Sequence, residues 1–201
     1  MLLIRLCFCV QIILLASLAM PMSHALAQRQ GMSIDDQPGL IPDAVDEELS
    51  PELQRQIVSY RSNEVPGTII IHTSERFLYV VQPNGRALRY GIGVGRDGFQ
   101  WQGLLRITRK QEWPDWTPPP EMIERQPYLP RFMAGGPGNP LGARALYLGA
   151  TVYRIHGTNQ PQTIGTAVSS GCFRLVNDDV TDLYNRTPIG TKVIVRQHPE
   201  L

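Results

Sequence analysis

The stretch HGTNQPQTIGTAVSSGCFRLVN, residues 156–177, contains one histidine and one cysteine and decides how the rest of the chain is interpreted. His156 and Cys172 are sixteen residues apart, and small residues precede the cysteine. A thiol on a tight turn, with an upstream imidazole as its base, is one way to build a nucleophile. A turn-rich surface loop with an inert thiol is the alternative, and the spacing alone does not separate the two.

The first 27 residues have the pattern of a secretory signal peptide. Arg5 supplies a positive charge, an apolar run extends from residue 6 to about residue 20, and residues 25–27 (Ala-Leu-Ala) form a small-x-small cleavage pattern. We expect cleavage after Ala27, so that the protein meets the membrane only during export and then lies in the periplasm. The alternative is an uncleaved anchor, although the apolar run is short for a membrane-spanning helix.

Removal of the signal peptide would leave Cys172 as the only cysteine, because Cys7 and Cys9 lie within residues 1–27. Exported proteins meet an oxidising compartment, so a single mature cysteine is either a buried bystander or a reactive thiol. The charges balance, since the chain has 19 Lys and Arg against 18 Asp and Glu and Arg5 leaves with the signal peptide. This balance gives no indication of a nucleic-acid partner.

Composition divides the mature chain into an arm and one domain. Residues 28–64 are a polar linker or arm, interrupted by Pro and Gly, and the role of residues 28–49 is left open. One short helix is expected near residues 50–62, because Ser50 can act as its N-cap and Pro51 fits the first helical position. Residues 65–198 form the domain that contains the histidine and the cysteine.

This domain is predicted to be mostly β, a small β-sandwich or barrel with one or two short helices, because short β-branched and aromatic runs alternate with turn residues. Residues 83–85 (Pro-Asn-Gly) are a hairpin signal. The one convincing helix after the sheet begins is residues 178–187, with Asp178 or Asp179 as its cap. Residues 113–140 are a long Pro- and Gly-rich insertion, expected to be an ordered flap because it holds two tryptophans.

The residues around Cys172 fit the needs of a nucleophilic thiol, which are a base, donors for an oxyanion and an exposed sulfur. Gly171 can adopt backbone angles that other residues avoid, so that the Gly171 and Cys172 N–H groups can face a cleft. Arg174 falls on the same strand side as Cys172, where it can lower the thiol pKa or hold a carboxylate. His156 ends a predicted strand, and Gly157 lets the chain turn immediately after it.

The remaining candidates are weaker. His72 is interpreted as structural, and His198 lies in the C-terminal tail. One cysteine and dispersed histidines give no zinc-ligand spacing, so no metal or other cofactor is expected. The glycines of residues 91–98 are interpreted as strand and turn glycines rather than a phosphate loop, because no helix pattern follows them. Trp113 and Trp116 either stack on substrate or pack the flap on the sheet.

The segments RIHGTN, IGTAVSSGCFRLVN and GTKVIV together resemble the signature of the L,D-transpeptidase catalytic domain family, also called YkuD-type and including ErfK/YbiS-like proteins. That signature is a histidine followed, after a gap, by Ser-His-Gly-Cys and an arginine two residues further on. The resemblance extends over residues 66–196, but Ser170 stands where the family usually has histidine. This departure puts the thiol pKa and the choice of acceptor in question. The matching residues are His156, Ser169, Gly171, Cys172 and Arg174.

The resemblance implies a small β-sandwich catalytic fold and a cysteine-dependent acyltransferase that acts on peptidoglycan stem peptides. Cys172 would be the nucleophile and His156 its base, with the Gly157 carbonyl holding the imidazole tautomer. The Ser170, Gly171 and Cys172 N–H groups would form the oxyanion hole. The implied oxyanion and substrate-binding positions are Ser169, Ser170, Gly171, Arg174, Trp113 and Trp116.

On this resemblance the thiolate attacks the L-centred carbonyl of the third residue of a tetrapeptide stem and releases D-Ala. An amine then takes the acyl group, either from a second stem or from a lysine of an outer-membrane protein. Carbapenem acylation of Cys172 is expected on the same basis. The alternatives are an L,D-carboxypeptidase that uses water and a peptidoglycan-binding module that Ser170 leaves catalytically impaired. Papain-like peptidases fit less well because they place Cys before His in the chain, and sortases fit less well because they space the two residues more widely.

Overall fold

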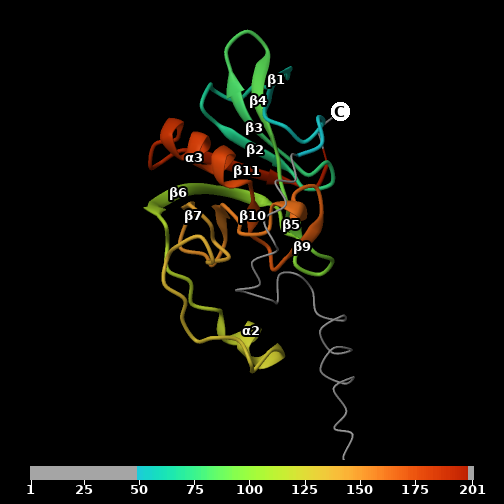
Figure 1. Cartoon of the computed structure of the whole chain (residues 1–201). Coiled ribbons are helices and arrows are strands. Elements are labelled where there is room, and N and C mark those ends of the chain that lie inside the picture. Colours follow the sequence, from blue (N-terminus) through green and yellow to red (C-terminus); the bar gives the residue numbers. More distant parts are fainter. Residues whose placement is uncertain (1–48, 199–201) are drawn as a thin grey trace, which may run out of the picture. The chain divides into compact units, whose positions relative to one another are not determined.

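The computed structural model describes residues 49–198, so the expected signal peptide and residues 28–48 of the arm lie outside the described part. Strands make up most of the regular secondary structure in this part of the chain, and the mostly β fold expected from the sequence is confirmed (Figure 1). The helices are α2 (Pro120–Arg125) and α3 (Asn177–Arg186), with a 3-10 turn at Pro161–Thr163. The strands are β1 (Gln56–Ser59), β2 (Ile69–His72), β3 (Phe77–Gln82), β4 (Arg86–Gly91), β5 (Val94–Gly95), β6 (Gly103–Glu112), β7 (Arg144–Leu148), β8 (Arg154–His156), β9 (Ala167–Ser169), β10 (Phe173–Arg174) and β11 (Lys192–Arg196).

One sheet joins nine of these strands, in the order β1-β4-β3-β2-β11-β6-β7-β8-β10, and β5 pairs separately with β9. The long strand β6 belongs to both halves of the sheet, because its first residues pair with β11 and the rest pair with β7. The register shifts between Ile107 and Arg109, and such an irregularity bends a strand and increases its twist. The sheet therefore folds over along β6, whose curved ribbon is visible in Figure 1.

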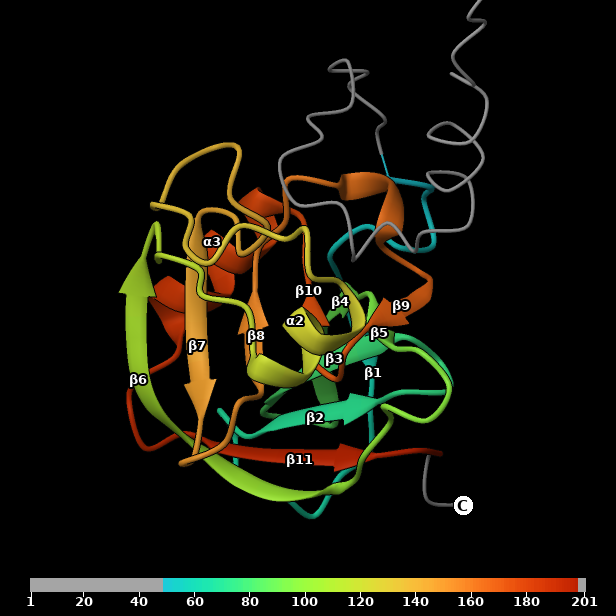
Figure 2. The ribbon, with the colours of Figure 1, turned by 90° about the horizontal axis from the view of Figure 1, so that it is seen from below.

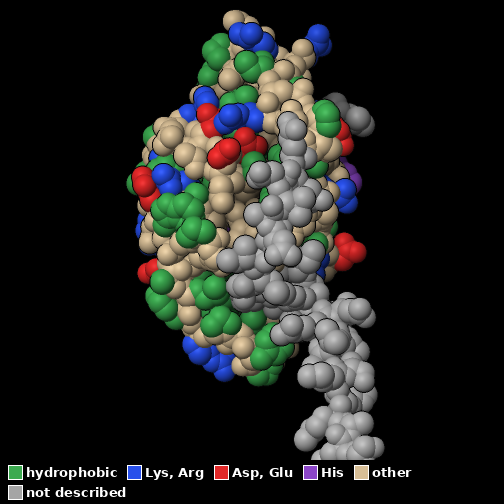
Figure 3. All heavy atoms as spheres, viewed as in Figure 1, with side chains coloured by type: hydrophobic (Ala, Val, Ile, Leu, Met, Phe, Trp, Pro, Cys, Tyr) green, Lys and Arg blue, Asp and Glu red, His purple; other side chains and the backbone are tan. Residues whose placement is uncertain are grey.

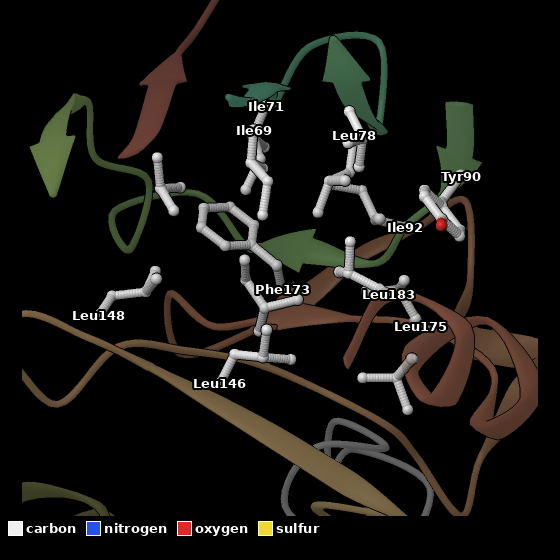
Figure 4. Packing of buried hydrophobic residues seen from close by; sticks show 14 of the residues in the cluster. Ile69, Ile71, Leu78, Tyr90, Ile92, Leu146, Leu148, Phe173, Leu175 and Leu183 are labelled. Atoms are coloured by element: carbon white, nitrogen blue, oxygen red, sulfur yellow. The ribbon is translucent and has the colours of Figure 1, made fainter. Parts of the chain in front are cut away.

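The two halves of the sheet enclose the main hydrophobic core. Figure 4 shows Phe173 between the side chains of Ile69 and Ile71 from β2 and those of Leu146 and Leu148 from β7. Each of these side chains is 1% exposed or less. Phe173 directly follows the cysteine, so the core fixes the backbone next to the thiol.

The hairpin signal at residues 83–85 is confirmed, because β3 and β4 pair antiparallel with Gln82 opposite Arg86. Asn84 and Gly85 both have positive φ, 62° and 66°, which asparagine and glycine tolerate better than other residues. The turn residues in the sequence thus match the backbone that this connection requires.

The short helix expected near residues 50–62 is wrong. Residues 51–53 form a turn, and β1 pairs antiparallel with β4 at the edge of the sheet. The Ser50 hydroxyl donates to the Glu52 carboxylate at 2.7 Å instead of capping a helix. Ile57 is 58% exposed, so a helix here would have little apolar surface to bury, whereas pairing with β4 satisfies the main chain.

Helix α3 is present where expected, but the expected Asp178 or Asp179 cap is wrong. Its N-cap position is Val176, and no side chain caps it. Asn177 Oδ1 accepts a hydrogen bond from the Ala143 N–H at 2.9 Å, which ties the start of the helix to the start of β7. The two aspartates lie in the first turn, where the helix dipole favours negative charge without a capping bond.

The 113–140 insertion is ordered around a small core of its own. Trp116, Met122, Leu129 and Leu141 form this cluster, and each is 7% exposed or less. The insertion carries α2, which Figure 2 shows in front of β8 and β10. The flap expected from the sequence therefore packs as a unit near the strands that carry the histidine and cysteine motif.

The described surface reflects the balanced charge of the sequence. On the face shown in Figure 3, basic and acidic side chains lie interspersed and do not gather into a patch of one sign. None of the helices within residues 49–198 is long and apolar enough to cross a membrane.

Candidate active site

Three neighbouring strands position the motif residues. β8 pairs antiparallel with β7 and parallel with β10, with Ile155 opposite Phe173 and His156 opposite Arg174. Ile155 and Phe173 point into the core, so the residues that flank them point to the other side of the strands. His156 and Arg174 therefore lie side by side, next to the turn that carries Cys172.

The imidazole of His156 is held by the main chain that follows it. Nδ1 lies 2.5 Å from the Gly157 carbonyl oxygen, and because a carbonyl can only accept, Nδ1 donates and Nε2 is left as the basic nitrogen. Burial lowers the pKa of His156 to about 4, the Gly157 bond opposes this change, and the charge of Arg154 adds to it. His156 is thus neutral at neutral pH, as a general base must be.

Ser169 and Gly171 shape the turn that presents Cys172. Gly171 has a φ of 106°, and a Cβ there would lie 2.6 Å from the Tyr153 ring, so glycine is required. The Ser169 hydroxyl donates to the Cys172 carbonyl oxygen at 2.6 Å and accepts from the Gly171 N–H at 3.1 Å. One of the three expected oxyanion donors, the Gly171 N–H, is therefore already bonded to Ser169.

A tryptophan outside the motif also fixes this turn. The Trp101 indole N–H donates to the Gly171 carbonyl oxygen at 2.9 Å. Its ring stacks on Tyr153 with 4.5 Å between ring centroids, and lies against Phe173 at 5.6 Å. The carbonyl side of the turn is thus tied to an aromatic group that is continuous with the core.

Cys172 is partly exposed, and its thiol donates to the Val152 carbonyl oxygen at 3.8 Å, not to the imidazole, in the described structure. Burial raises the pKa of the thiol, whereas the charge and hydrogen bonds of Arg154 act in the opposite direction. The resting pair is therefore a neutral thiol near a neutral imidazole.

A pocket of about 70 Å³ brings the candidate residues together. Cys172, His156, Ser169, Ser170 and Arg174 all line it, and no acidic side chain within residues 49–198 does. Arg174 is 4% exposed, and burial lowers its pKa to about 10, so it remains charged at neutral pH. The pocket is therefore positively charged and suits a ligand that carries a carboxylate.

The two tryptophans of the flap have different positions. Trp116 is 6% exposed and lines the pocket together with Pro119 and Met122 of the flap. Trp113 does not line the pocket, is 41% exposed, and has a φ of 39° where the flap begins. The structure thus brings only Trp116 of this pair to the site.

Arg154 and Trp101 reach the site without having been expected from the sequence. Arg154 precedes His156 by two residues in a strand, which is the spacing that places Arg174 beside Cys172, so strand alternation was a usable signal for it. Trp101 lies between β5 and β6, and nothing in its local sequence indicates that its indole contacts Gly171.

Other features of the described residues lie away from this pocket. A larger cavity of about 680 Å³ is formed by residues 58–64 and the outer face of the sheet, near His72 and Tyr79. His72 Nε2 lies 2.8 Å from the Tyr60 hydroxyl oxygen. Within residues 49–198, no group of three or more His, Cys, Asp or Glu side chains is placed to hold a metal. The glycine-rich residues 91–98 contain the last residue of β4 and the whole of β5, and the next element is the strand β6.

The part of the chain that contains this site is similar to known proteins. The sequence profile of the L,D-transpeptidase catalytic domain, YkuD, matches residues 66–195. The probable L,D-transpeptidase ErfK/SrfK of Escherichia coli strain K12 is 39% identical over 140 residues, which are 65% of this chain and 44% of that protein. The chain thus spans less than half the length of this relative.

Two solved structures are also similar. A crystal structure from Brucella melitensis, described as a probable carnitine operon oxidoreductase, is 49% identical, with a TM-score of 0.50 and coverage of 74% of this chain and 96% of that one. An L,D-transpeptidase from Mycobacterium smegmatis is 16% identical, with a TM-score of 0.52 and coverage of 64% of this chain and 58% of that one. At 16% identity the second similarity shows the fold alone.

Proposed function

The chain belongs to the YkuD family of L,D-transpeptidase catalytic domains, and from this premise we propose that it is a cysteine-dependent acyltransferase that acts on peptidoglycan stem peptides. The observation that carries the proposal is the pocket shared by Cys172 and His156, in which the Gly157 carbonyl leaves Nε2 as the basic nitrogen. The positive charge of Arg174 supports a substrate with a carboxylate, and so does the lack of acidic side chains among the described residues that line the pocket.

In the proposed first step, Cys172 attacks the L-centred carbonyl carbon of the third residue of a tetrapeptide stem while its proton passes to His156 Nε2. The C–S bond forms and the carbonyl oxygen becomes an oxyanion, which main-chain N–H groups stabilise. We assign this role to the Ser170 and Cys172 N–H groups, joined by that of Gly171 when Ser169 releases it. The C–N bond to D-Ala then breaks, and the imidazolium returns the proton to the leaving amine.

In the proposed second step, an amine attacks the thioester carbonyl and gives its proton to His156. The C–S bond breaks, and the sulfur takes the proton back from the imidazolium, which restores the neutral pair. The amine belongs either to the third residue of a second stem or to a lysine of an outer-membrane protein. Water in the same position would give an L,D-carboxypeptidase.

The proposed location follows from the substrate. Peptidoglycan lies outside the cytoplasmic membrane, and a signal peptide over residues 1–27, outside the described part, would deliver the enzyme to the periplasm. Within the site, we propose that Trp116 covers the stem peptide and that Arg174 holds its carboxylate. Both line the pocket with Cys172.

The oxidoreductase name of the Brucella melitensis protein finds no counterpart in the glycine-rich segment of this chain. A dinucleotide-binding glycine loop opens a helix whose N-terminus holds the pyrophosphate. Residues 91–98 are instead followed by β6. We therefore keep acyl transfer as the proposed reaction.

Intact-mass spectrometry after mixing with a carbapenem tests this proposal, with Cys172→Ala and His156→Ala alongside. We expect a one-to-one mass increase that is lost in Cys172→Ala and is strongly slowed in His156→Ala. Muropeptide assays with a lysine-containing peptide or a second stem then identify the acceptor. A folded protein that gains no mass would refute the enzyme and favour a binding module, with Ser170 as the first residue to revert to histidine.

A further inference from the structure

We propose that Arg154 is a second functional arginine of this site and that its guanidinium stabilises the thiolate form of Cys172. The inference rests on the proposed function, because it concerns the same nucleophile. The stability of the thiolate is nevertheless a property of the free protein, so it can be measured without any peptide or antibiotic.

Strand pairing places Arg154 next to the nucleophile. β10 and β8 pair in parallel with Phe173 opposite Ile155, so the residues one position earlier, Cys172 and Arg154, are neighbours across the two chain segments. Phe173 and Ile155 point into the core, which directs Cys172 and Arg154 to the opposite side. Both line the same pocket.

The guanidinium of Arg154 lies near an aromatic ring, and one of its donors has no partner among the described residues. Its Cζ lies 5.2 Å from the ring centroid of Tyr147, which is opposite Arg154 in β7, and a cation over an aromatic face is attracted to it. The Nε atom of Arg154 is buried and has no hydrogen-bond partner among the described residues. Such a buried donor in a native protein calls for a ligand, an ion or water as its partner.

In the part of the chain that the structure describes, no acidic side chain lines the pocket, so none there neutralises the charge of Arg154. The charged or titratable groups that line the pocket with Cys172 are Arg154 and His156 from β8 and Arg174 from β10, and the flap contributes only uncharged residues. The charge and hydrogen bonds of Arg154 lower the pKa of Cys172 against the larger effect of burial. The same charge lowers the pKa of His156, so a proton accepted from the thiol passes more readily to the leaving amine.

The alkylation rate of Cys172 as a function of pH tests this role, because only the thiolate reacts. Full-length Arg154→Gln and wild-type protein are treated with light iodoacetamide, denatured, and treated with heavy iodoacetamide. Peptide mass spectrometry then gives the light fraction at Cys172 in each protein, separately from Cys7 and Cys9. We expect the Cys172 pKa to rise by about one unit in Arg154→Gln, so that alkylation at pH 7 slows about tenfold.

Two further variants make the test specific. Arg109→Gln removes another arginine that stacks on Tyr147, at 3.6 Å, but does not line the pocket, so its profile should match wild type. Arg154→Lys keeps a positive charge, so its Cys172 pKa should rise by less than half of the rise in Arg154→Gln. If Arg154→Gln does not fold, Arg154→Met, which keeps the apolar stem, replaces it.

A folded Arg154→Gln or Arg154→Met protein with the wild-type alkylation profile would overturn the inference. Failure of the proposed function appears differently, as a wild-type protein that alkylates normally but forms no adduct with a carbapenem. The two outcomes are therefore read from separate experiments on the same protein.

Discussion

Replacing His156 with glutamine is predicted to change how the stability of the protein depends on pH. Burial lowers the pKa of His156 to about 4 in the folded protein, whereas an unfolded histidine has a pKa of about 6.5. Between these values the unfolded chain binds a proton that the folded protein does not. The free energy of unfolding therefore falls as the pH drops through this interval and is fully restored above it.

The size of the effect follows from the width of that interval. The interval is about 2.5 pH units at about 1.4 kcal/mol per unit, or about 3.5 kcal/mol in full. At pH 4 the folded protein is itself half protonated, so about 3 kcal/mol of stability is lost on acidification to that pH. His156 is only 4% exposed, so solvent screens little of this. Asp179 changes the free energy of unfolding in the opposite direction, because burial raises its pKa to about 6. The stability that its protonated form contributes is lost as the pH rises through that value. Asp179 is present in both proteins, so it cancels in their difference.

Urea unfolding at four pH values between 4 and 7, followed by circular dichroism, measures this difference. The free energy of unfolding of wild type minus that of His156→Gln should be about 3 kcal/mol larger at pH 7 than at pH 4. His198→Gln is the matched control, since His198 is exposed near the C-terminus and its replacement removes a histidine without opening the core.

A difference between wild type and His156→Gln that stays constant within about 0.5 kcal/mol over this range would refute the reasoning. The imidazole would then not be held neutral by burial. A base that is already protonated near pH 6 cannot accept the thiol proton there, so the assignment of His156 as general base would lose its physical support.

Two further predictions concern the turn that carries Cys172. Gly171→Ala should destabilise the protein by about 1–3 kcal/mol and slow carbapenem acylation, because alanine is strained at this φ and its Cβ meets the Tyr153 ring. Gly98 is the control, because it has a φ of 81° but nothing near the position of an added Cβ. Thermal unfolding of Gly98→Ala therefore measures backbone strain alone, and Gly171→Ala should lose more stability. Equal losses of stability in the two variants would show that the contact with Tyr153 costs nothing. Trp101→Phe keeps the stacked ring but loses the 2.9 Å bond to the Gly171 carbonyl, and we expect a stability loss of about 1 kcal/mol and several-fold slower acylation. Unchanged acylation would show that this bond does not position the nucleophile.

Local chemistry predicted those elements whose residues interact with near neighbours in the chain. The hairpin between β3 and β4 follows from Asn84 and Gly85, whose positive φ values these two residue types tolerate. The strands follow from β-branched runs, and the ordered flap follows from its tryptophans. The motif also predicted the residues His156 and Cys172 as a pair, and the structure places them in one pocket.

Non-local pairing explains what the sequence did not reveal. A helix near residues 50–62 had acceptable capping residues, yet the edge of β4 offered hydrogen bonds to the same backbone and formed β1. The contact of Trp101 with Gly171 joins residues 70 positions apart. Trp113 and Trp116 are the same residue type in the same segment, so the sequence does not distinguish them. The packing of the flap brings Trp116, and not Trp113, to the pocket.

The site combines residues on rigid paired strands with residues in an adjustable turn, and this difference affects how acyl transfer would proceed. His156 and Arg174 lie on paired strands whose other face is the core, so neither can move far without opening packed side chains. Gly171 lies in a turn, and its N–H is bonded to the hydroxyl of Ser169, which a rotation of one side chain would release. His156, the proposed base, is therefore fixed in position by the core, whereas the proposed oxyanion donors can adjust within the turn. In the proposed reaction, proton transfer would thus depend on burial and charge, and stabilisation of the oxyanion would depend on a small movement beside Cys172.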